Sequence, residues 1–443
     1  MRNPPTHYYK RSMVKNLLFI SLLGCGLSAS AQRYLAEYDS TLFIRDTVRP
    51  LVKRLENLRF SGYIQPQFQV AQAQGAPSVE GGNFTPFSNN RFMLRRARIK
   101  IDYLLPALQP HFPRASFTFQ VDATERGVIV RDMFLRLYQE KQNHLSFTIG
   151  LFARPFGYEV NLSSGYRESP ERSRASQTLM PGERDLGAML SYEGQHPESK
   201  RPFLKFDIGV FNGQGPAGTT DFDSYKDLVS RLSLKPLLLA KPLTMSGGLS
   251  LLYGGWRQGS KYIYRQGMTN GKPAFVIDSS LSNIGKPAPR HYYGADIQLA
   301  FRHRKSKTEM RGEYWRGKQP GTATGSVTPG VLLLEPLYQR HFDAAVFYLI
   351  QTLGSPNWEA VLKLDWYDPN TKAKEGEIGA AGANLTAGDV RFTTIGFGLT
   401  HYFGANLKAL GYYSLVRNEK TALPAFTTDQ RDNVFTLRLQ LRF

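Results

Sequence analysis

The sequence predicts an all-β fold, a transmembrane antiparallel β-barrel of about 16 strands that follows a short N-terminal periplasmic extension. Three observations predict it. Apolar residues recur at every second position over segments of about ten residues, the length that a tilted spanning strand needs. Aromatic residues gather at the ends of those segments, and the last segment closes the chain on an aromatic residue. In such a barrel, alternate side chains face lipid and a water-filled interior, and aromatic girdles mark the two interfaces.

Residues 1–31 have the order of a secretory signal peptide. A basic leader precedes the apolar run Leu17–Leu23, and small residues end at Ala31, so that cleavage is expected before Gln32. A buried N-terminal helix is the alternative, which the basic, apolar and small order disfavours. The sequence therefore predicts an exported protein.

The single cysteine, Cys25, lies inside that signal. The run Leu22-Leu23-Gly24-Cys25 resembles a lipoprotein cleavage box, so lipidation of Cys25 stays open beside an inert cysteine. Cleavage before Gln32 leaves no cysteine in the mature chain, which excludes disulfides, zinc thiolates and cysteine nucleophiles. We expect no cofactor and no metal site.

Residues 32–58 differ in pattern from residues 59–443. Their apolar residues recur at roughly helical spacing among charged ones, which predicts a short periplasmic helix or tether, with a disordered leader as the alternative. These residues are Leu42, Val48, Leu51, Val52, Leu55 and Leu58. Residues 59–443 show no linker or repeat that would divide them, and we expect one barrel domain.

The composition fits an exported barrel. Hydrophobic residues make up 41% of the chain and aromatic residues 12%, and the formal net charge is +20. After the signal no apolar run is long enough for a transmembrane helix. In an exported protein this charge does not indicate nucleic acid as a partner; it favours contact with lipopolysaccharide or with an anionic solute.

Alternation of apolar and polar residues is regular in residues 60–70 and 115–124. It recurs in Leu145–Ala153, Leu204–Val210, Tyr293–Phe301, Trp358–Trp366 and Leu407–Leu415. Soluble antiparallel sheets also alternate, so segment length and aromatic ends decide for a barrel. In the last strand, apolar residues stand at every second position up to the terminal Phe443, which resembles the C-terminal signature of outer-membrane barrels.

The links between these segments alternate in length. Short links such as residues 403–406 predict periplasmic turns. Longer stretches rich in Gly, Pro and polar residues predict extracellular or inward-folded loops. They are residues 71–90, 155–185, 212–226, 257–290, 317–336, 368–389 and 418–430.

The densest basic cluster lies in residues 91–103. If its apolar residues face lipid, Arg96, Arg98 and Lys100 line the lumen, because a charge at mid-membrane costs ~2–4 kcal/mol. The same parity places further cations inward: Arg136, Arg231, Lys363, Lys408, Arg438 and Arg442. A pore lined in this way attracts anions. The alternative is that these arginines pair with luminal acids and stiffen the wall; the candidate acids are Asp102, Asp122, Asp132 and Asp365.

Several motifs resemble the phosphate-selective porin O/P family. They are Gly62-Tyr63-Ile64-Gln65, Arg95-Arg96-Ala97-Arg98, Asp132-Met133-Phe134, residues 150–157, Glu168–Arg172, Arg184-Asp185-Leu186-Gly187 and residues 211–215. The resemblance spans most of residues 59–443 and is strongest over 91–215. It implies a sixteen-stranded homotrimeric porin with an arginine ladder and a constriction loop, here residues 155–185. The residues that would serve that loop are Arg154, Arg167, Arg172, Arg174, Arg184 and Asp185.

The resemblance also implies a lysine cluster that attracts phosphate. Only Lys226, Lys235 and Lys261 are candidates for it, and none matches position by position. The expected function is passive diffusion of anions, with phosphate or phosphorylated solutes first. The alternative is a plugged structural or adhesive barrel that binds a surface partner through its long loops.

Catalysis is not indicated. The eight histidines are scattered, and neither a His-Glu-x-x-His run nor a Gly-x-Ser-x-Gly elbow is present. His144 and Ser146 share a strand face, but a luminal histidine near a serine is far commoner than a hydrolase pair. We expect no enzyme activity.

Overall fold

The computed structural model describes residues 56–106, 113–139, 144–194, 203–218, 220–303 and 306–443. The predicted signal peptide, Cys25 and nearly all of the predicted periplasmic segment lie outside the described residues. In the described ranges no helix is long and apolar enough to span a membrane.

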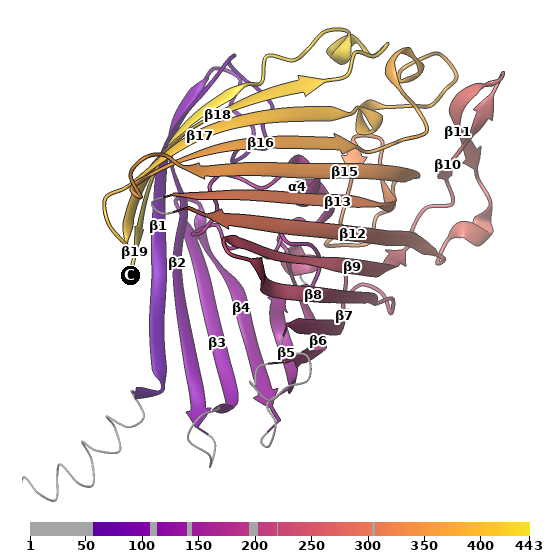
Figure 1. The fold of residues 1–443 in the computed structure, drawn as a ribbon. Helices are drawn as coiled ribbons and strands as arrows, with labels where there is room; N and C mark the ends of the chain where they lie inside the picture. The colour runs from indigo at the N-terminus through magenta and orange to yellow at the C-terminus, as the bar shows by residue number, and fades with distance from the viewer. Residues whose placement is uncertain (1–55, 107–112, 140–143, 195–202, 219, 304–305) are drawn as a thin grey trace, which may run out of the picture. The chain divides into compact units, whose positions relative to one another are not determined.

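Sixteen antiparallel strands of the described chain form one closed barrel, as predicted (Figure 1). They are β1 (Leu58–Ala71), β2 (Asn90–Pro106), β3 (Pro113–Thr124), β4 (Gly127–Tyr138), β5 (Leu145–Ala153), β6 (Arg184–Glu193), β7 (Leu204–Phe211), β8 (Asp227–Ala240), β9 (Leu243–Arg257), β12 (Pro287–Arg302), β13 (Lys307–Thr322), β15 (Leu337–Thr352), β16 (Trp358–Asp368), β17 (Phe392–Tyr402), β18 (Leu407–Asn418) and β19 (Val434–Arg442). Three short strands belong to the loops: β10 (Ile263–Thr269), β11 (Lys272–Asp278) and β14 (Gly325–Ser326).

The first and last strands close the ring. β1 pairs with β19 in antiparallel register from Tyr63 opposite Arg442 to Ala71 opposite Val434. The pairing extends to the last residue, since Gly62 and Phe443 exchange both backbone hydrogen bonds, at 3.0 and 3.1 Å. The terminal alternating segment is therefore the strand that joins the two edges of the sheet, which leaves no open edge in the barrel.

Link lengths define two ends of the barrel. At one end β8 and β9, β15 and β16, and β17 and β18 are joined by short links; at the other end most connections are long. We call these the short-link end and the long-loop end. The long connections are residues 72–89, 154–183, 212–226, 258–286, 323–336, 369–391 and 419–433. Residues 125–126, between β3 and β4, form the one tight turn at the long-loop end among the described residues.

The period of two separates the two faces of the wall. In β19, Leu437 and Leu439 are about half exposed on the outer face, whereas Arg438 and Gln440 are buried in the lumen. The alternation breaks in β2, because the consecutive residues Arg95 and Arg96 both reach the luminal carboxylate of Glu171.

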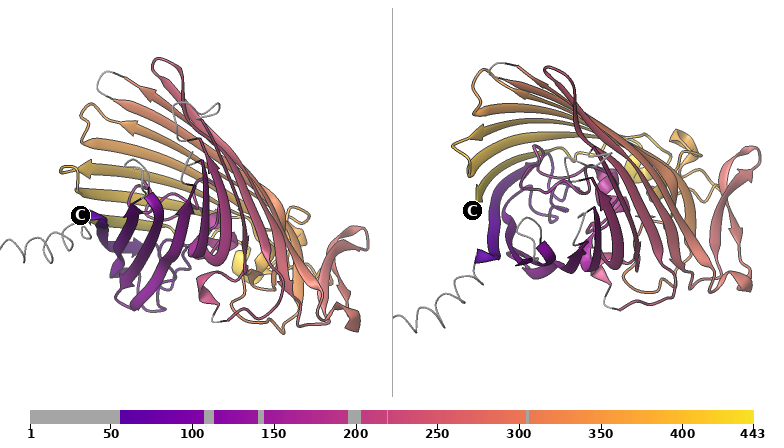
Figure 2. Two further views of the ribbon diagram at one scale, coloured as in Figure 1. Left: turned by 90° about the horizontal axis from the view of Figure 1, so that it is seen from below. Right: turned by 60° about the horizontal axis from the view of Figure 1, so that its bottom comes forward.

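The long connection between β5 and β6 folds into the lumen. We call residues 154–183 the inward loop; it contains a short helix, α4 (Arg174–Leu179), whose N-cap hydroxyl on Ser173 accepts from the Ser176 amide. The view along the barrel in Figure 2 shows purple-to-magenta chain inside the ring of strands.

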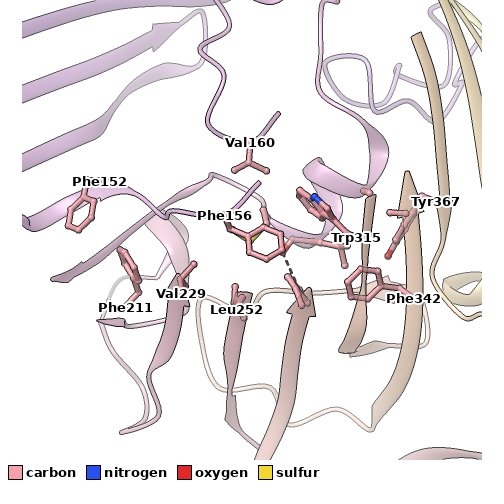
Figure 3. Close-up of a cluster of buried hydrophobic side chains, with 14 of the residues drawn as sticks. Phe152, Phe156, Val160, Phe211, Val229, Leu252, Trp315, Phe342 and Tyr367 are labelled. Atoms are coloured by element: carbon pink, nitrogen blue, oxygen red, sulfur yellow. Dashed lines mark hydrogen bonds between the residues drawn. The ribbon is translucent and has the colours of Figure 1, made fainter. Parts of the chain in front are cut away.

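An apolar cluster fastens the inward loop to the wall (Figure 3). Phe156, at the start of the loop, is fully buried and makes edge-to-face contacts with Tyr292 and Trp315 at ring-centroid distances of 5.9 and 5.0 Å. The other members are Phe152, Val160, Ala175, Leu179, Met180, Met189, Phe211, Val229, Leu252, Phe342, Ala344 and Tyr367. Part of the lumen is therefore an apolar core rather than the polar space that alternation predicts.

Candidate functional site

The inward loop enters the lumen through a tight turn at Gly157. Its φ of +69° is a conformation that glycine adopts at low cost. The amides of Tyr158 and Glu159 then donate to the two carboxylate oxygens of Glu313 at 3.0 and 2.8 Å. A wall carboxylate thus caps the first backbone amides of the loop.

Glu159 joins the two ends of the loop to the wall. It accepts from the Ser173 amide at 2.9 Å, from the Ser176 hydroxyl at 2.6 Å and from the Tyr348 hydroxyl at 2.6 Å. Burial by itself raises the pKa of Glu159, but Lys363 and these hydrogen bonds outweigh burial and lower the pKa to about 2. Glu159 is therefore a carboxylate at neutral pH.

Wall side chains also hold the apex of the loop by its backbone carbonyls. Five such hydrogen bonds reach residues 164–171: Gln65 to Ser164 at 3.1 Å, Gln440 to Gly165 at 3.0 Å, Lys408 to Arg167 at 3.1 Å, Arg438 to Pro170 at 2.8 Å and Lys363 to Glu171 at 3.3 Å. Three of these donors are cations that the strand parity places inward. These three cations therefore bind carbonyl oxygens of the loop instead of facing open water.

Two glutamates of the loop each form ion pairs with three arginines. Glu171 binds Arg95 at 2.7 Å, Arg96 at 3.0 Å and Arg438 at 3.1 Å. Burial raises the pKa of Glu171, but these arginines outweigh burial and hold it well below its usual range.

Glu183, the last residue of the loop, contacts three more arginines: Arg131, Arg172 and Arg184. Burial raises its pKa too, and the three arginines hold it well below its usual range. Arg184 also pairs with Asp132 of β4 at 3.0 Å. The loop is therefore tied to the wall by ion pairs at its apex and at its last residue.

A cavity of about 610 Å³ lies between the inward loop and strands β1 to β8 and β19. Lys205 is the second residue of β7, Arg136 is near the end of β4 and Arg442 ends β19, so the cavity extends toward the short-link end. Among the described residues that line it, Asp132 and Asp207 are acidic. Seven are cationic: Arg98, Lys100, Arg136, Arg184, Lys205, Arg231 and Arg442.

The cations of the cavity differ in their partners. Five have a carboxylate: Arg98 with Asp122 at 2.9 Å, Lys100 with Asp102 at 2.8 Å, Arg184 with Asp132 at 3.0 Å, Lys205 with Asp207 at 3.1 Å and Arg231 with Asp296 at 2.6 Å. Arg136 donates to the Thr148 hydroxyl at 2.9 Å, and Arg442 lies 4.1 Å over the ring of Tyr166. Among the described residues neither Arg136 nor Arg442 has a carboxylate within ion-pair distance.

The six residues predicted as an anion ladder divide into two groups. Arg98, Lys100, Arg136 and Arg231 line the cavity, while Arg96 and Arg438 bind Glu171 and lie outside its lining. Pairing with Asp102 and Asp122, the alternative from the sequence, is present in the same wall. The ladder as a unit stays a prediction.

The residues predicted for the constriction loop also lie in different surroundings. Arg184 lines the cavity, and Arg172 binds Glu183. Arg154 is fully buried, and its guanidinium nitrogens have no hydrogen-bond partner among the described residues. The remaining three are also placed: Arg167 is buried beside Arg96, Arg174 stacks 3.8 Å over Phe392, and Asp185 accepts from the Leu186 and Gly213 amides at 2.9 and 2.7 Å.

The lysine candidates lie away from the cavity. Lys226 pairs with Asp221 at 2.5 Å, Lys235 pairs with Glu193 at 2.9 Å, and Lys261 lies 5.0 Å over the ring of Tyr262. Lys205, which lines the cavity, was not among the cations predicted to point inward, although the alternation of Leu204–Val210 places it on the opposite face from the apolar residues.

Comparison with protein-family models finds no match for this chain, and no curated protein matches it. Solved structures do match. The high-pH structure of Pseudomonas putida OprB aligns with a TM-score of 0.57 and 9% identity, over 90% of this chain and 97% of OprB. A loop L8 deletion mutant of OmpT, an outer membrane protein of Vibrio cholerae, aligns with a TM-score of 0.49 and 8% identity, over 87% of this chain and 99% of the mutant. Salmonella typhi OmpF in complex with daunomycin aligns with a TM-score of 0.48 and 11% identity, over 87% of this chain and 97% of OmpF.

The likeness to OprB is one of fold, and it agrees with the closure, the link lengths and the apolar outer face. The chain therefore has a closed antiparallel barrel fold of 16 strands, and its place is the bacterial outer membrane, in agreement with its apolar outer face.

Proposed function

We propose that the protein is a passive channel of the outer membrane that prefers anions. The observation that carries this proposal is the cavity, whose described lining holds seven cationic and two acidic side chains. In a water-filled passage with low-dielectric walls, such an excess concentrates anions and raises the barrier for cations. No catalytic group takes part in this function.

Phosphate and phosphorylated solutes are the proposed cargo. Guanidinium groups match phosphate oxygens with two parallel hydrogen bonds, and Arg136 and Arg442 have no competing carboxylate among the described residues. The motifs that resemble the phosphate-selective porins support the same choice.

Neutralising the cavity tests the anion preference. In planar bilayers under a KCl gradient, the reversal potential of the wild type should lie between zero and the equilibrium potential of chloride. The triple variant Lys100→Gln, Arg136→Gln, Lys205→Gln should move it toward zero. Lys226→Gln removes a cation outside the cavity and should leave it unchanged. A cation-selective wild type contradicts the proposal.

Phosphate itself gives a sharper test. A multivalent anion that binds in the cavity should reduce the single-channel chloride current, and the triple variant should lose this block. A chloride current that phosphate does not reduce would contradict phosphate as the cargo, but it would not contradict a general preference for anions.

A second candidate function is suggested by the inward loop and its apolar cluster, which fill part of the lumen. Such a barrel could be plugged and act through its long loops on a surface partner. Electrical silence of the purified, heat-modifiable barrel would favour this second function. In either case we propose contact with lipopolysaccharide and a homotrimer, which the resemblance to the phosphate-selective porins implies; chemical crosslinking in membranes measures the subunit number.

A further inference from the structure

We propose that Glu171 is the positioning residue of the channel: it holds the inward loop against the wall and masks Arg95, Arg96 and Arg438. The proposal rests on the channel function above. It predicts that one loop carboxylate controls both the width of the passage and the number of arginines that a permeating anion meets.

The contacts of Glu171 support the holding role. Its side chain is 2% exposed, and its two oxygens receive guanidinium nitrogens from β2 and β19. Arg95 binds with two nitrogens, at 2.7 and 3.0 Å, which is the bidentate geometry that gives a strong, directional pair. Because β2 and β19 each pair with β1, Glu171 joins the two strands that flank β1.

The charges around Glu171 support the masking role. Three guanidinium groups share one carboxylate, so the group keeps an excess of two positive charges even when Glu171 is ionised. Arg167 lies in the same surroundings, and its buried Nε and Nη1 atoms have no hydrogen-bond partner among the described residues. Without the carboxylate these cations would repel one another in a poorly hydrated space, and the loop would move away.

Glu168 provides a matched control on the same loop. It lies three residues before Glu171 and binds Arg311 of β13 with two contacts, at 2.8 and 2.9 Å. Arg311 has a second carboxylate, Glu309, at 2.6 Å. Glu168→Gln therefore changes the luminal charge by the same amount as Glu171→Gln, but it leaves its arginine paired.

The experiment compares the two variants of the full chain in planar bilayers with chloride and potassium as the permeating ions. Glu171→Gln should raise the single-channel conductance and the current noise. It should also move the reversal potential closer to the equilibrium potential of chloride than Glu168→Gln does. Glu171→Asp keeps the charge and should return both quantities toward wild type. Equal effects of Glu171→Gln and Glu168→Gln would overturn the proposal.

Arg95→Gln is the second variant, used if Glu171→Gln fails to assemble. The Arg95 side chain is 24% exposed, and its loss leaves Arg96 and Arg438 on Glu171. We expect an assembled channel with increased current noise, because one of the three ion pairs of Glu171 is lost. An assembled Arg95→Gln channel with the noise of wild type would overturn the holding role.

The outcome separates this inference from the proposed function. A silent wild type with a conducting Glu171→Gln variant would contradict the open channel and support the holding role. A conducting, anion-preferring wild type whose Glu171→Gln variant behaves like Glu168→Gln would support the channel and contradict the inference.

Discussion

The ring of Phe443 occupies the space that a side chain on Gly62 would need. A β-carbon built on Gly62 lies 2.5 Å from the Phe443 ring, and these two residues also exchange backbone hydrogen bonds at the closure of the barrel. The absence of a side chain at residue 62 and the aromatic ring at residue 443 thus belong to one contact between the two edges of the sheet.

Gly62→Val should therefore impair closure. A branched side chain would meet both the Phe443 ring and the Arg98 carbonyl oxygen, and would strain the pairing of β1 at the short-link end. We expect less heat-modifiable barrel in outer membranes with unchanged secretion, and deletion of Phe443 should act in the same direction. Gly411→Val is the control, because nothing lies within 4 Å of a β-carbon at that position. Normal assembly of Gly62→Val would contradict the importance of this contact.

Gly157→Ala should loosen the inward loop. The residue has φ +69°, and a β-carbon there would contact Glu313 and lie 2.9 Å from the Trp315 ring. The cost of the backbone conformation alone is about 1 kcal/mol, and displacement of Glu313 releases the amides of Tyr158 and Glu159. Single-channel recordings should show more frequent conductance fluctuations. Gly376→Ala, in open space on another loop, should leave the recordings unchanged.

Moderate acid should not release the loop. The pKa of Glu159 is lowered from 4.5 to about 2, so its stabilisation is fully present above about pH 4.5 and is lost as the pH falls through about 2. A shift of this size corresponds to roughly 3 kcal/mol. Conductance and noise should be constant from pH 7 to 5, with loosening only in strong acid. Glu159→Gln should show the loosened state already at pH 7, and release of the wild-type loop near pH 5 would contradict the assignment.

Asp432 should have the opposite pH dependence. It is 3% exposed in the loop between β18 and β19, and its Oδ1 has no hydrogen-bond partner among the described residues. Burial raises its pKa from 3.8 to about 6, so the native state binds the proton more tightly and stability falls as the pH rises from about 4 to about 6.

Asp432→Asn removes that cost. The variant should have a higher unfolding temperature than wild type at pH 7.5, and the difference should shrink as the pH is lowered toward 4. Asp429→Asn, which breaks an exposed pair with Arg417, should show no such gain at neutral pH. An Asp432→Asn difference that is independent of pH would contradict the titration.

The sequence by itself determined the barrel, because strand alternation is a local property. Each residue of a strand faces the opposite side from its neighbour, so the apolar positions of β19 could be assigned to lipid without knowledge of any contact. Long polar stretches likewise predicted the connections at one end of the barrel, and the cations at Arg98, Lys100, Arg136 and Arg231 were placed inward by the same parity.

The shared partner of Arg95, Arg96 and Arg438 was decided by tertiary structure alone. Glu171 meets Arg95, Arg96 and Arg438 only because the inward loop crosses the lumen, and no periodicity relates residue 171 to residue 438. The apolar cluster around Phe156 has the same origin, since it joins a loop to wall residues that alternation alone assigns to a polar interior. Alternation assigns a side chain to a face of the wall, but pairing and burial within the lumen depend on the three-dimensional path of a loop.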